Sequence, residues 1–300
     1  MTTTKLTFIH ALSPLHAGTG QGIGVIDLPI AREKATNIPF LPGSSLKGSL
    51  RDLCTSDKKI AVFGPETNNA DAHAGAAVFS DQRLLLLPVR SLRGTFAWAT
   101  SPYVLQRLKR DAADAGVNVS ALKELPGIAE TECLIASQGS ELTQQGGQTA
   151  QTTNVYLEDF DLTGKPSDAA DAWAQFIGAK VFDDVKWQAA LKARLCILND
   201  NVFNFLLEHG TEITARVKLL DDKKTVQSGA LWYEEALPAE TILSGLLVYA
   251  KSKQATAEEV FSAVSGIVAE HKAIQLGGKA TVGRGLCSVR MTGDEKGAAQ

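Results

Sequence analysis

Strand-like segments lie near both ends of this chain, and helical segments alternate with strands between them. Residues 5–12 (KLTFIHAL) and Leu286–Met291 have the short apolar character of strands. A helix is expected at residues 102–115, and another begins after Thr256, which forms a capping box with Glu259. This interleaved order favours an α+β domain built on a ferredoxin-like core, with further lobes attached, over a Rossmann fold.

Composition places the chain among ordinary globular proteins. Of its 300 residues, 44% are hydrophobic and 21% are charged, which excludes wholesale disorder. No apolar run approaches the ~20 residues that a membrane span needs, and the first residues lack the basic and apolar regions of a signal peptide. We therefore expect a cytoplasmic protein without membrane contact.

Cysteine spacing and net charge limit the kinds of protein that this chain can be. The four cysteines lie far apart without a C-x-x-C pair, so buried free thiols are expected rather than structural zinc or disulfides. The formal net charge of −3 argues mildly against a protein that grips nucleic acid alone, because phosphate neutralisation usually needs a basic surface. Local clusters of basic residues can still bind a phosphate backbone.

Long segments separate the central strands. Residues 138–153 are polar, contain glycine and lie between two strand-like segments, so a protruding hairpin is expected at about 132–160. Residues 168–209 carry apolar side chains at helical spacing and are expected to be helical. Residues 212–220 alternate between apolar and polar side chains, which predicts a further strand.

Two glycine-rich loops have the wrong spacing for a nucleotide site. In residues 278–285 (GKATVGRG), Arg284 and Gly285 stand where a Walker A loop needs Lys and Ser/Thr, and no helix follows. In residues 18–25 (GTGQGIGV), the third glycine of the dinucleotide pattern is missing. Each loop by itself is explained by a tight turn between strands.

Together, the two loops favour contact with an extended phosphate backbone. Successive glycine amides can bind phosphates without a nucleotide motif. A helix N-terminus at residues 43–46, with Ser44 or Ser45 as its cap, offers the same chemistry. The basic residues beside these segments are Lys47, Arg51, Lys279 and Arg284.

Six blocks of the sequence carry a family resemblance. They are LSPLHAGTG, IDLPIAREK, FLPGSSLKGSLR, FSDQRLLLLPVRSLRGTFAW, GALWYEEALPAET and LGGKATVGRGLC. In this order they closely resemble the repeated backbone subunit of the type III-B CRISPR (Cmr) effector complex, a member of the RAMP superfamily. We therefore expect a single RAMP domain over residues 1–291, followed by a flexible tail at 292–300.

The resemblance implies a modified RNA-recognition-motif (ferredoxin-like) palm with a thumb and helical insertions. It implies that copies of the chain stack with other Cmr subunits into a filament along a CRISPR RNA. Each thumb is expected to displace one nucleotide of the single-stranded target RNA. The target is then expected to be cleaved at that position with a divalent metal, Mg²⁺ or Mn²⁺.

The resemblance also assigns the cleavage residues. The aspartate of the ID-x-P block is Asp27, which is expected to hold the metal and to act in cleavage. The histidine of the LSP-x-H block is His16, and the paired glutamates of the GALW block are Glu234 and Glu235; these are further catalytic candidates. Ala236 stands where a tyrosine is expected in some relatives, so no role is carried over to it.

Contacts with the RNA backbone are expected in three segments. Glycines ahead of Asp27 would let their loop lie against RNA without a side-chain clash. The GSSLKG block and the glycine loop near the end of the chain resemble guide-RNA contacts. The residues expected to bind RNA are Gly18, Gly20, Ser44, Ser45, Lys47, Arg51, Gly277, Gly278, Lys279, Gly283, Arg284 and Gly285.

Elementary chemistry is consistent with these assignments, and alternatives stay open. RNA carries its own nucleophile, the 2′-hydroxyl, so cleavage needs in-line geometry and charge stabilisation more than many catalytic groups. One carboxylate can hold Mg²⁺ when phosphate oxygens and water complete the shell. Alternatively, Asp27 only closes a turn, His16 ends a strand, and Glu234 and Glu235 form a solvated strand end. The chain would then be a non-catalytic RNA-binding scaffold of the same filament.

Overall fold

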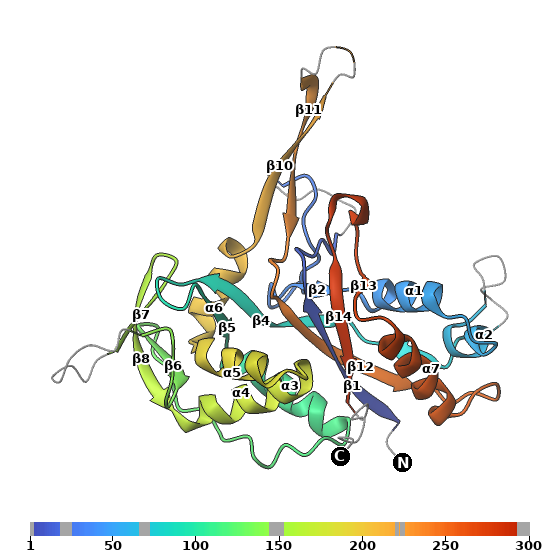
Figure 1. The fold of residues 1–300 in the computed structure, drawn as a ribbon, viewed down its shortest axis with the longest axis horizontal. Helices are drawn as coiled ribbons and strands as arrows, with labels where there is room; N and C mark the ends of the chain where they lie inside the picture. Colours follow the sequence, from blue (N-terminus) through green and yellow to red (C-terminus); the bar gives the residue numbers. More distant parts are fainter. Residues whose placement is uncertain are drawn as a thin grey trace.

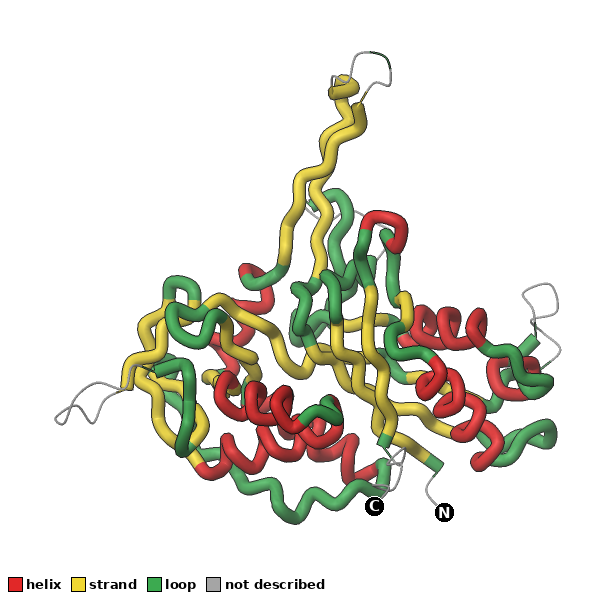
Figure 2. The backbone as a smooth tube through the Cα atoms, in the orientation of Figure 1, coloured by secondary structure: helices red, strands yellow, loops and turns green. Residues whose placement is uncertain are grey.

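The computed structural model describes residues 3–18, 26–65, 73–143, 153–219, 222 and 226–292. These residues form one extended mixed sheet, a separate two-stranded arm, and helices packed around the sheet (Figure 1 and Figure 2). The helices are α1 (Gly43–Leu53), α2 (Lys59–Phe63), α3 (Pro102–Asp114), α4 (Asp168–Val181), α5 (Val185–Arg194), α6 (Asp200–His209) and α7 (Ala257–Glu270). The strands are β1 (Thr4–Ala11), β2 (Phe40–Leu41), β3 (Ala77–Phe79), β4 (Gln82–Arg90), β5 (Phe96–Thr100), β6 (Glu132–Ala136), β7 (Thr153–Leu157), β8 (Phe160–Ser167), β9 (Leu195–Leu198), β10 (Glu212–Leu219), β11 (Val226–Ala236), β12 (Ile242–Tyr249), β13 (Ile274–Gln275) and β14 (Leu286–Met291).

Four antiparallel strands form the centre of the sheet in the order β14-β1-β12-β4. With the inserted elements set aside, β1, α1, β4, β12, α7 and β14 follow one another as β-α-β-β-α-β. This is the element order of a ferredoxin-like fold, and we call these four strands with α1 and α7 the palm. The α+β prediction is confirmed.

The two faces of β1 explain why helices cover both sides of the palm. Side chains alternate between the faces of a strand, so Lys5 and His10 point in opposite directions. The His10 ring packs edge-on against Phe182, which follows α4, with ring centroids 5.2 Å apart. Nζ of Lys5 lies 5.9 Å from the ring of Phe261 in α7. Helices α4 and α7 therefore cover opposite faces of the strand.

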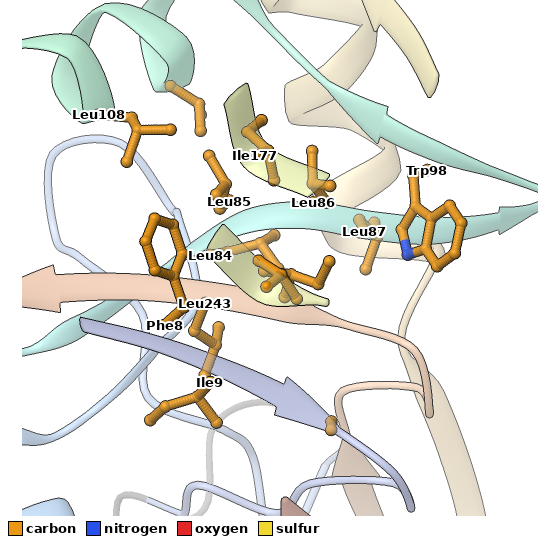
Figure 3. Packing of buried hydrophobic residues seen from close by; sticks show 14 of the residues in the cluster. Phe8, Ile9, Leu84, Leu85, Leu86, Leu87, Trp98, Leu108, Ile177 and Leu243 are labelled. Carbon is orange, nitrogen blue, oxygen red and sulfur yellow. The ribbon is translucent and has the colours of Figure 1, made fainter. Parts of the chain in front are cut away.

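The core is centred on β4, which is buried on both faces. Residues 84–87 are four consecutive leucines with almost no exposed surface, as expected for a strand that is covered on both sides. Figure 3 shows these leucines between Phe8 and Leu243 of the palm and Leu108 and Ile177 of the helices. Burying each such side chain contributes about 1.5–3 kcal/mol to the free energy of folding.

Strand β4 also joins the palm to the outer half of the sheet. Its first residues pair with β12, and residues 87–90 pair with β5. From β5 the sheet continues in the order β9-β6-β8-β7. The hairpin predicted at about 132–160 is wrong, because β6 pairs with β8 and β9, whereas β7 pairs with β8. Strand β8 takes the position beside β6, and this pairing could not be predicted from the turn residues between β6 and β7.

Two further expectations need correction. The helical region at 168–209 is interrupted by β9, whose four residues (LCIL) are all buried between β5 and β6. Neither Ser44 nor Ser45 caps α1, because the helix already begins at Gly43. The N–H of Gly43 instead donates to Oδ1 of Asp81 over 2.9 Å, so a carboxylate from a distant loop satisfies the helix start.

Strand β14, the last strand of the palm, ends at Met291, and the next residue is still attached to β1. Thr292 pairs with Leu6 through two hydrogen bonds of 2.9 and 3.1 Å. The rest of the expected tail, residues 293–300, lies outside the described residues. None of the helices in the described part of the chain is long and apolar enough to span a membrane.

Strands β10 and β11 form the arm, a two-stranded sheet that projects away from the palm (Figure 1). Directly opposed residues share a face of an antiparallel pair, so the register defines two different faces. One face carries Thr214, Arg216, Trp232 and Glu234. The other carries the buried Glu235 at the base of the arm together with exposed apolar side chains, whose exposed fractions are 53% for Ile213, 47% for Val217, 53% for Leu231 and 41% for Tyr233.

Candidate functional site

Asp27 lies at the base of the arm, on a segment that pairs with β11. The N–H of Leu28 donates to the carbonyl of Tyr233 over 3.1 Å, and the N–H of Glu235 donates to the carbonyl of Leu28 over 3.0 Å. The N–H of Tyr233 donates to Oδ2 of Asp27 over 2.7 Å. Asp27 is exposed, and its Oδ1 has no hydrogen-bond partner among the described residues. One oxygen therefore orients the carboxylate, and the other is left for a ligand.

His16 lies between β11 and the terminal loop, by which we mean residues 276–285. Its backbone pairs with Gly278, and its ring Nδ1 lies 2.7 Å from the carbonyl oxygen of Glu235. A carbonyl oxygen only accepts, so Nδ1 carries a proton and Nε2 is the acceptor of the neutral ring. A Cβ at Gly18 would stand 2.6 Å from Nε2, so Gly18 leaves room for the ring.

Glu235 is 3% exposed, and protein donors occupy both oxygens of its carboxylate. Oε2 accepts from the N–H of Ile30 over 3.0 Å. Oε1 accepts from Nη2 of Arg32 over 2.6 Å and from Oγ1 of Thr211 over 3.0 Å. The carboxylate is therefore engaged within the protein and turned away from solvent.

Glu234 is also buried, but its surroundings differ. Three cations approach its carboxylate without hydrogen-bonding distances: Arg216 at 3.7 Å, Lys279 at 3.8 Å and Arg284 at 3.6 Å. Oε1 of Glu234 has no hydrogen-bond partner within the described part of the chain. The side chains of Arg216 and Lys279 are about a third exposed, at 31% and 36%. Arg216 and Lys279 therefore place positive charge at the surface, next to the buried negative charge of Glu234.

The terminal loop is fixed against the rest of the site by its backbone and by Arg284. Gly277 has φ of +70°, and a Cβ there would stand 2.5 Å from the carbonyl oxygen of His16, so glycine is required. The buried Arg284 donates to Glu212 over 2.9 Å and to Thr214 over 3.1 Å, at the start of β10. Gly283 and Gly278 are exposed, whereas Gly285 is buried. The loop thus presents the backbone near Lys279 to solvent while Arg284 fastens the arm.

The α1 residues form a second group. Ser44 is exposed, and Ser45, Lys47 and Arg51 are half-buried. Burial, and then the charge of Arg51, lower the pKa of Lys47. Arg51 donates to the carbonyl of Gly64, which anchors its guanidinium within the protein. No hydrogen bond or ion pair between described residues connects this group to Asp27 or His16.

The structure thus brings the four catalytic candidates together with the terminal loop. Gly20 lies outside the described residues, whereas Gly18 contacts His16. Sequence reasoning missed the residues that complete the site, although the alternation of β10 could have placed one of them on the polar face. The missed residues are Arg32, Thr211, Thr214 and Arg216.

The donor atoms of the site suit a metal that is shared with a bound phosphate. No group of three or more His, Cys, Asp or Glu side chains that could hold a metal ion is found among the described residues. Asp27 nevertheless offers a carboxylate oxygen, Oδ1, that has no hydrogen-bond partner within the described ranges. Mg²⁺ commonly binds one or two carboxylates together with phosphate oxygens and water, so this chemistry fits an ion whose remaining ligands come from a phosphate group and water.

A family model described as RAMP superfamily matches residues 8–288. The chain belongs to this superfamily. It is 35% identical, over 95% of each chain, to the CRISPR system Cmr endoribonuclease Cmr4 of Pyrococcus furiosus.

Solved structures agree with this membership. The crystal structure of oligomeric Cmr4 from Pyrococcus furiosus matches with a TM-score of 0.73 and 29% identity, covering 97% of this chain and 98% of that chain. A chain of the type III-B Cmr-beta complex bound to cognate target RNA matches with a TM-score of 0.71. That chain is 22% identical, with 96% of both chains covered, and it shows the same fold.

Proposed function

We propose that this chain is an RNA-cleaving backbone subunit of a type III-B CRISPR (Cmr) effector complex. Its partners are a CRISPR guide RNA, single-stranded target RNA, further copies of the chain and other Cmr subunits. The Pyrococcus relative is named as an endoribonuclease, and its crystal structure is that of an oligomer. The observation that carries the proposal is the exposed carboxylate of Asp27, at the base of an arm with exposed apolar side chains; one of its oxygens has no hydrogen-bond partner in the part of the chain that the structure describes.

The guide RNA is bound along the exposed amides and cations of the palm. Lys279 and Arg216 hold positive charge at the surface of the terminal loop and arm, and Lys47 adds a cation at the start of α1. A net charge of −3 allows only local basic clusters of this kind. Stacking many copies along one RNA multiplies weak contacts, so each copy needs only a few of them.

The arm is the thumb that separates guide from target. Its apolar face includes Leu231 and Tyr233, and the N–H of Tyr233 orients Asp27. Apolar side chains that enter a duplex unstack neighbouring bases. A nucleotide displaced by the arm would therefore leave its phosphate close to Asp27, with the backbone free to reach an in-line geometry.

The residues of this chain position and stabilise the reacting phosphate. The 2′-hydroxyl of the RNA attacks the adjacent phosphorus, and the 5′-oxygen of the next nucleotide leaves. Nε2 of His16 is placed to take the proton of the 2′-hydroxyl, because Nδ1 donates to the carbonyl oxygen of Glu235. The leaving 5′-oxygen takes a proton from water. Asp27 would hold a divalent cation, Mg²⁺ or Mn²⁺, through its carboxylate. Such a cation stabilises the negative charge that develops on the phosphate.

We also propose that the protein works in the cytoplasm. Cys54, Cys133, Cys196 and Cys287 are all buried free thiols, as expected in a reducing compartment.

Asp27→Asn in the assembled complex tests the cleavage role. Asn keeps an oxygen that can accept from the N–H of Tyr233, so the loop should hold its place, but it lacks the charge that a hard cation needs. Losing one such transition-state contact commonly costs about 3–4 kcal/mol, or a few hundred-fold in rate. Target cleavage is measured with Mg²⁺ and Mn²⁺, beside guide retention and target binding. Asp57→Asn, an exposed aspartate near α2, is the matched control.

The result decides between an enzyme and a scaffold. Lost cleavage with unchanged assembly and target affinity supports the catalytic assignment, and partial rescue by higher metal concentration adds to it. Full cleavage by an intact Asp27→Asn complex would leave only the scaffold function standing.

A further inference from the structure

We propose that Glu235 is a positioning residue, which sets the geometry of Asp27 and His16 without touching RNA. The inference rests on the proposed function, because it assigns the residue that holds the cleavage site together. The carbonyl oxygen of Glu235 accepts a hydrogen bond from Nδ1 of His16, and the N–H of Glu235 donates to the carbonyl oxygen of Leu28. Since Leu28 follows Asp27 directly, one residue of β11 fixes both candidate reacting groups.

The side chain of Glu235 holds the same loop at two further points. Its carboxylate binds the N–H of Ile30 and the guanidinium of Arg32, and it also receives the hydroxyl of Thr211. The residues from Leu28 to Arg32 are thus attached to β11 along their length. Because this loop is bonded to β11, the Asp27 carboxylate beside it is held in place relative to the arm.

A carboxylate is needed at this position because all of its neighbours are donors. Three donors meet two oxygens, and the Arg32 and Glu235 side chains are only 18% and 4% exposed. A glutamine would turn an NH₂ group toward one of these donors and leave Arg32 without its counter-charge. The exchange of one atom therefore disturbs the loop while preserving the size of the side chain.

The adjacent glutamate shows that this role belongs to one face of β11. Glu234 points toward Lys279 and Arg284 of the terminal loop, whereas Glu235 points toward the Asp27 loop. Successive side chains of a strand lie on opposite faces. The two glutamates thus contact different neighbours, and of the two only Glu235 is bonded to the segment that follows Asp27.

The expected effect on cleavage follows from the demand for in-line geometry. A misplacement of about 1 Å can lower a rate by about 10²-fold. Glu235→Gln is therefore expected to lower the single-turnover rate constant of target cleavage by about 10–100-fold. The target concentration at half-maximal rate and the retention of guide RNA should stay near their wild-type values.

A second measurement follows the loop itself. Hydrogen exchange of residues 28–32 is recorded by mass spectrometry in the complex with guide RNA and without target. Glu235→Gln should accelerate exchange in this segment, because the N–H of Ile30 loses its acceptor. Glu240→Gln is the matched control: Glu240 lies after β11 and pairs with His10 over 2.7 Å, away from the loop.

Three outcomes are informative. A slower rate with unchanged target affinity and faster exchange confirms the positioning role. Unchanged exchange with lost cleavage would overturn it and make Glu235 a direct participant, and unchanged rate with unchanged exchange would overturn it as well. If Glu235→Gln does not fold, Thr211→Val removes one donor and should show the same changes on a smaller scale.

Failure of the proposed function would look different. A wild-type complex that binds target but does not cut it would overturn the proposed function. The exchange of residues 28–32 would still decide whether Glu235 holds the loop.

Discussion

Nε of Arg284 lies 3.6 Å from Oε1 of Glu234, a separation at which the two groups attract as charges without forming a hydrogen bond. Arg284 directs its two terminal nitrogens to Glu212 and Thr214 instead. Glu234 thus acts as a buried counter-charge at the junction of the arm and the terminal loop.

Glu234→Gln should lower the free energy of unfolding by about 1–3 kcal/mol, because three neighbouring cations lose the charge that balances them. The value is below that of a fully buried pair, since Arg216 and Lys279 are about a third exposed. Urea unfolding of the purified chain measures the change. Glu270→Gln, at the exposed end of α7, should leave stability unchanged. Lost cleavage at an unchanged unfolding midpoint would instead show that Glu234 acts in the reaction.

Lys47→Ala should weaken guide-RNA binding and flatten its dependence on salt. Each lost phosphate contact lowers the slope of log affinity against log salt by about 0.7 for a single strand. The measurement is a salt titration of guide retention in the assembled complex. Lys58→Ala is the control, because Lys58 pairs with Glu259 at 3.2 Å and is assigned no RNA contact. Equal slopes for the two variants would show that Lys47 makes no contact with the phosphates of the guide RNA.

The double variant Val217→Ser, Leu231→Ser should reduce target cleavage at least tenfold while the guide RNA stays bound. These residues oppose each other on the exposed face of the arm, so their replacement removes an apolar contact with little effect on stability. Gel analysis of cleavage products and thermal melting provide the two readouts. Val185→Ser, at a residue that is 73% exposed on α5, is the control. Normal cleavage by the double variant would exclude base displacement by this face.

Glu33→Gln should make the stability of the protein less dependent on acid pH. Arg107 donates two hydrogen bonds of 2.6 and 2.7 Å to Glu33, and these lower the pKa of the Glu33 carboxyl. The ionised Glu33 carboxylate therefore contributes to the free energy of unfolding above its unfolded-state pKa of about 4.3. This contribution is lost as the pH falls through the lower folded-state pKa. Urea midpoints across this range should fall less steeply for the variant, which starts lower at neutral pH. Parallel curves would show that the pair contributes nothing to stability.

Elements whose signals are local were predicted well from the sequence. The capping box of α7 forms as expected, with Thr256 and Glu259 bonded reciprocally at 2.8 and 3.2 Å. The strands at both ends of the chain also lie where their apolar runs indicated. Errors arose where a partner is distant in sequence. Asp81 satisfies the start of α1, and β8 takes the place beside β6.

The residues of the candidate site also fall into those that the sequence could indicate and those that it could not. The resemblance pointed to Asp27 and Glu235, but nothing local could show that a segment 206 positions away from Tyr233 would pair with β11. Arg32 and Thr211 were missed for this reason, because each matters only through Glu235. Arg216 could have been found, since the alternation of β10 places it on the polar face of the arm.

The neighbouring positions of β1 and β14 have a practical consequence for engineering. Thr7 pairs with Met291, and Figure 1 shows the start of β1 and the end of β14 on the side of the molecule opposite the arm. A fluorophore or affinity handle attached at the start of β1 or the end of β14 would therefore stand clear of the residues around Asp27. The same proximity favours circular permutation: a short peptide joining these two strand ends would preserve the strand order of the palm and allow new termini in a surface loop.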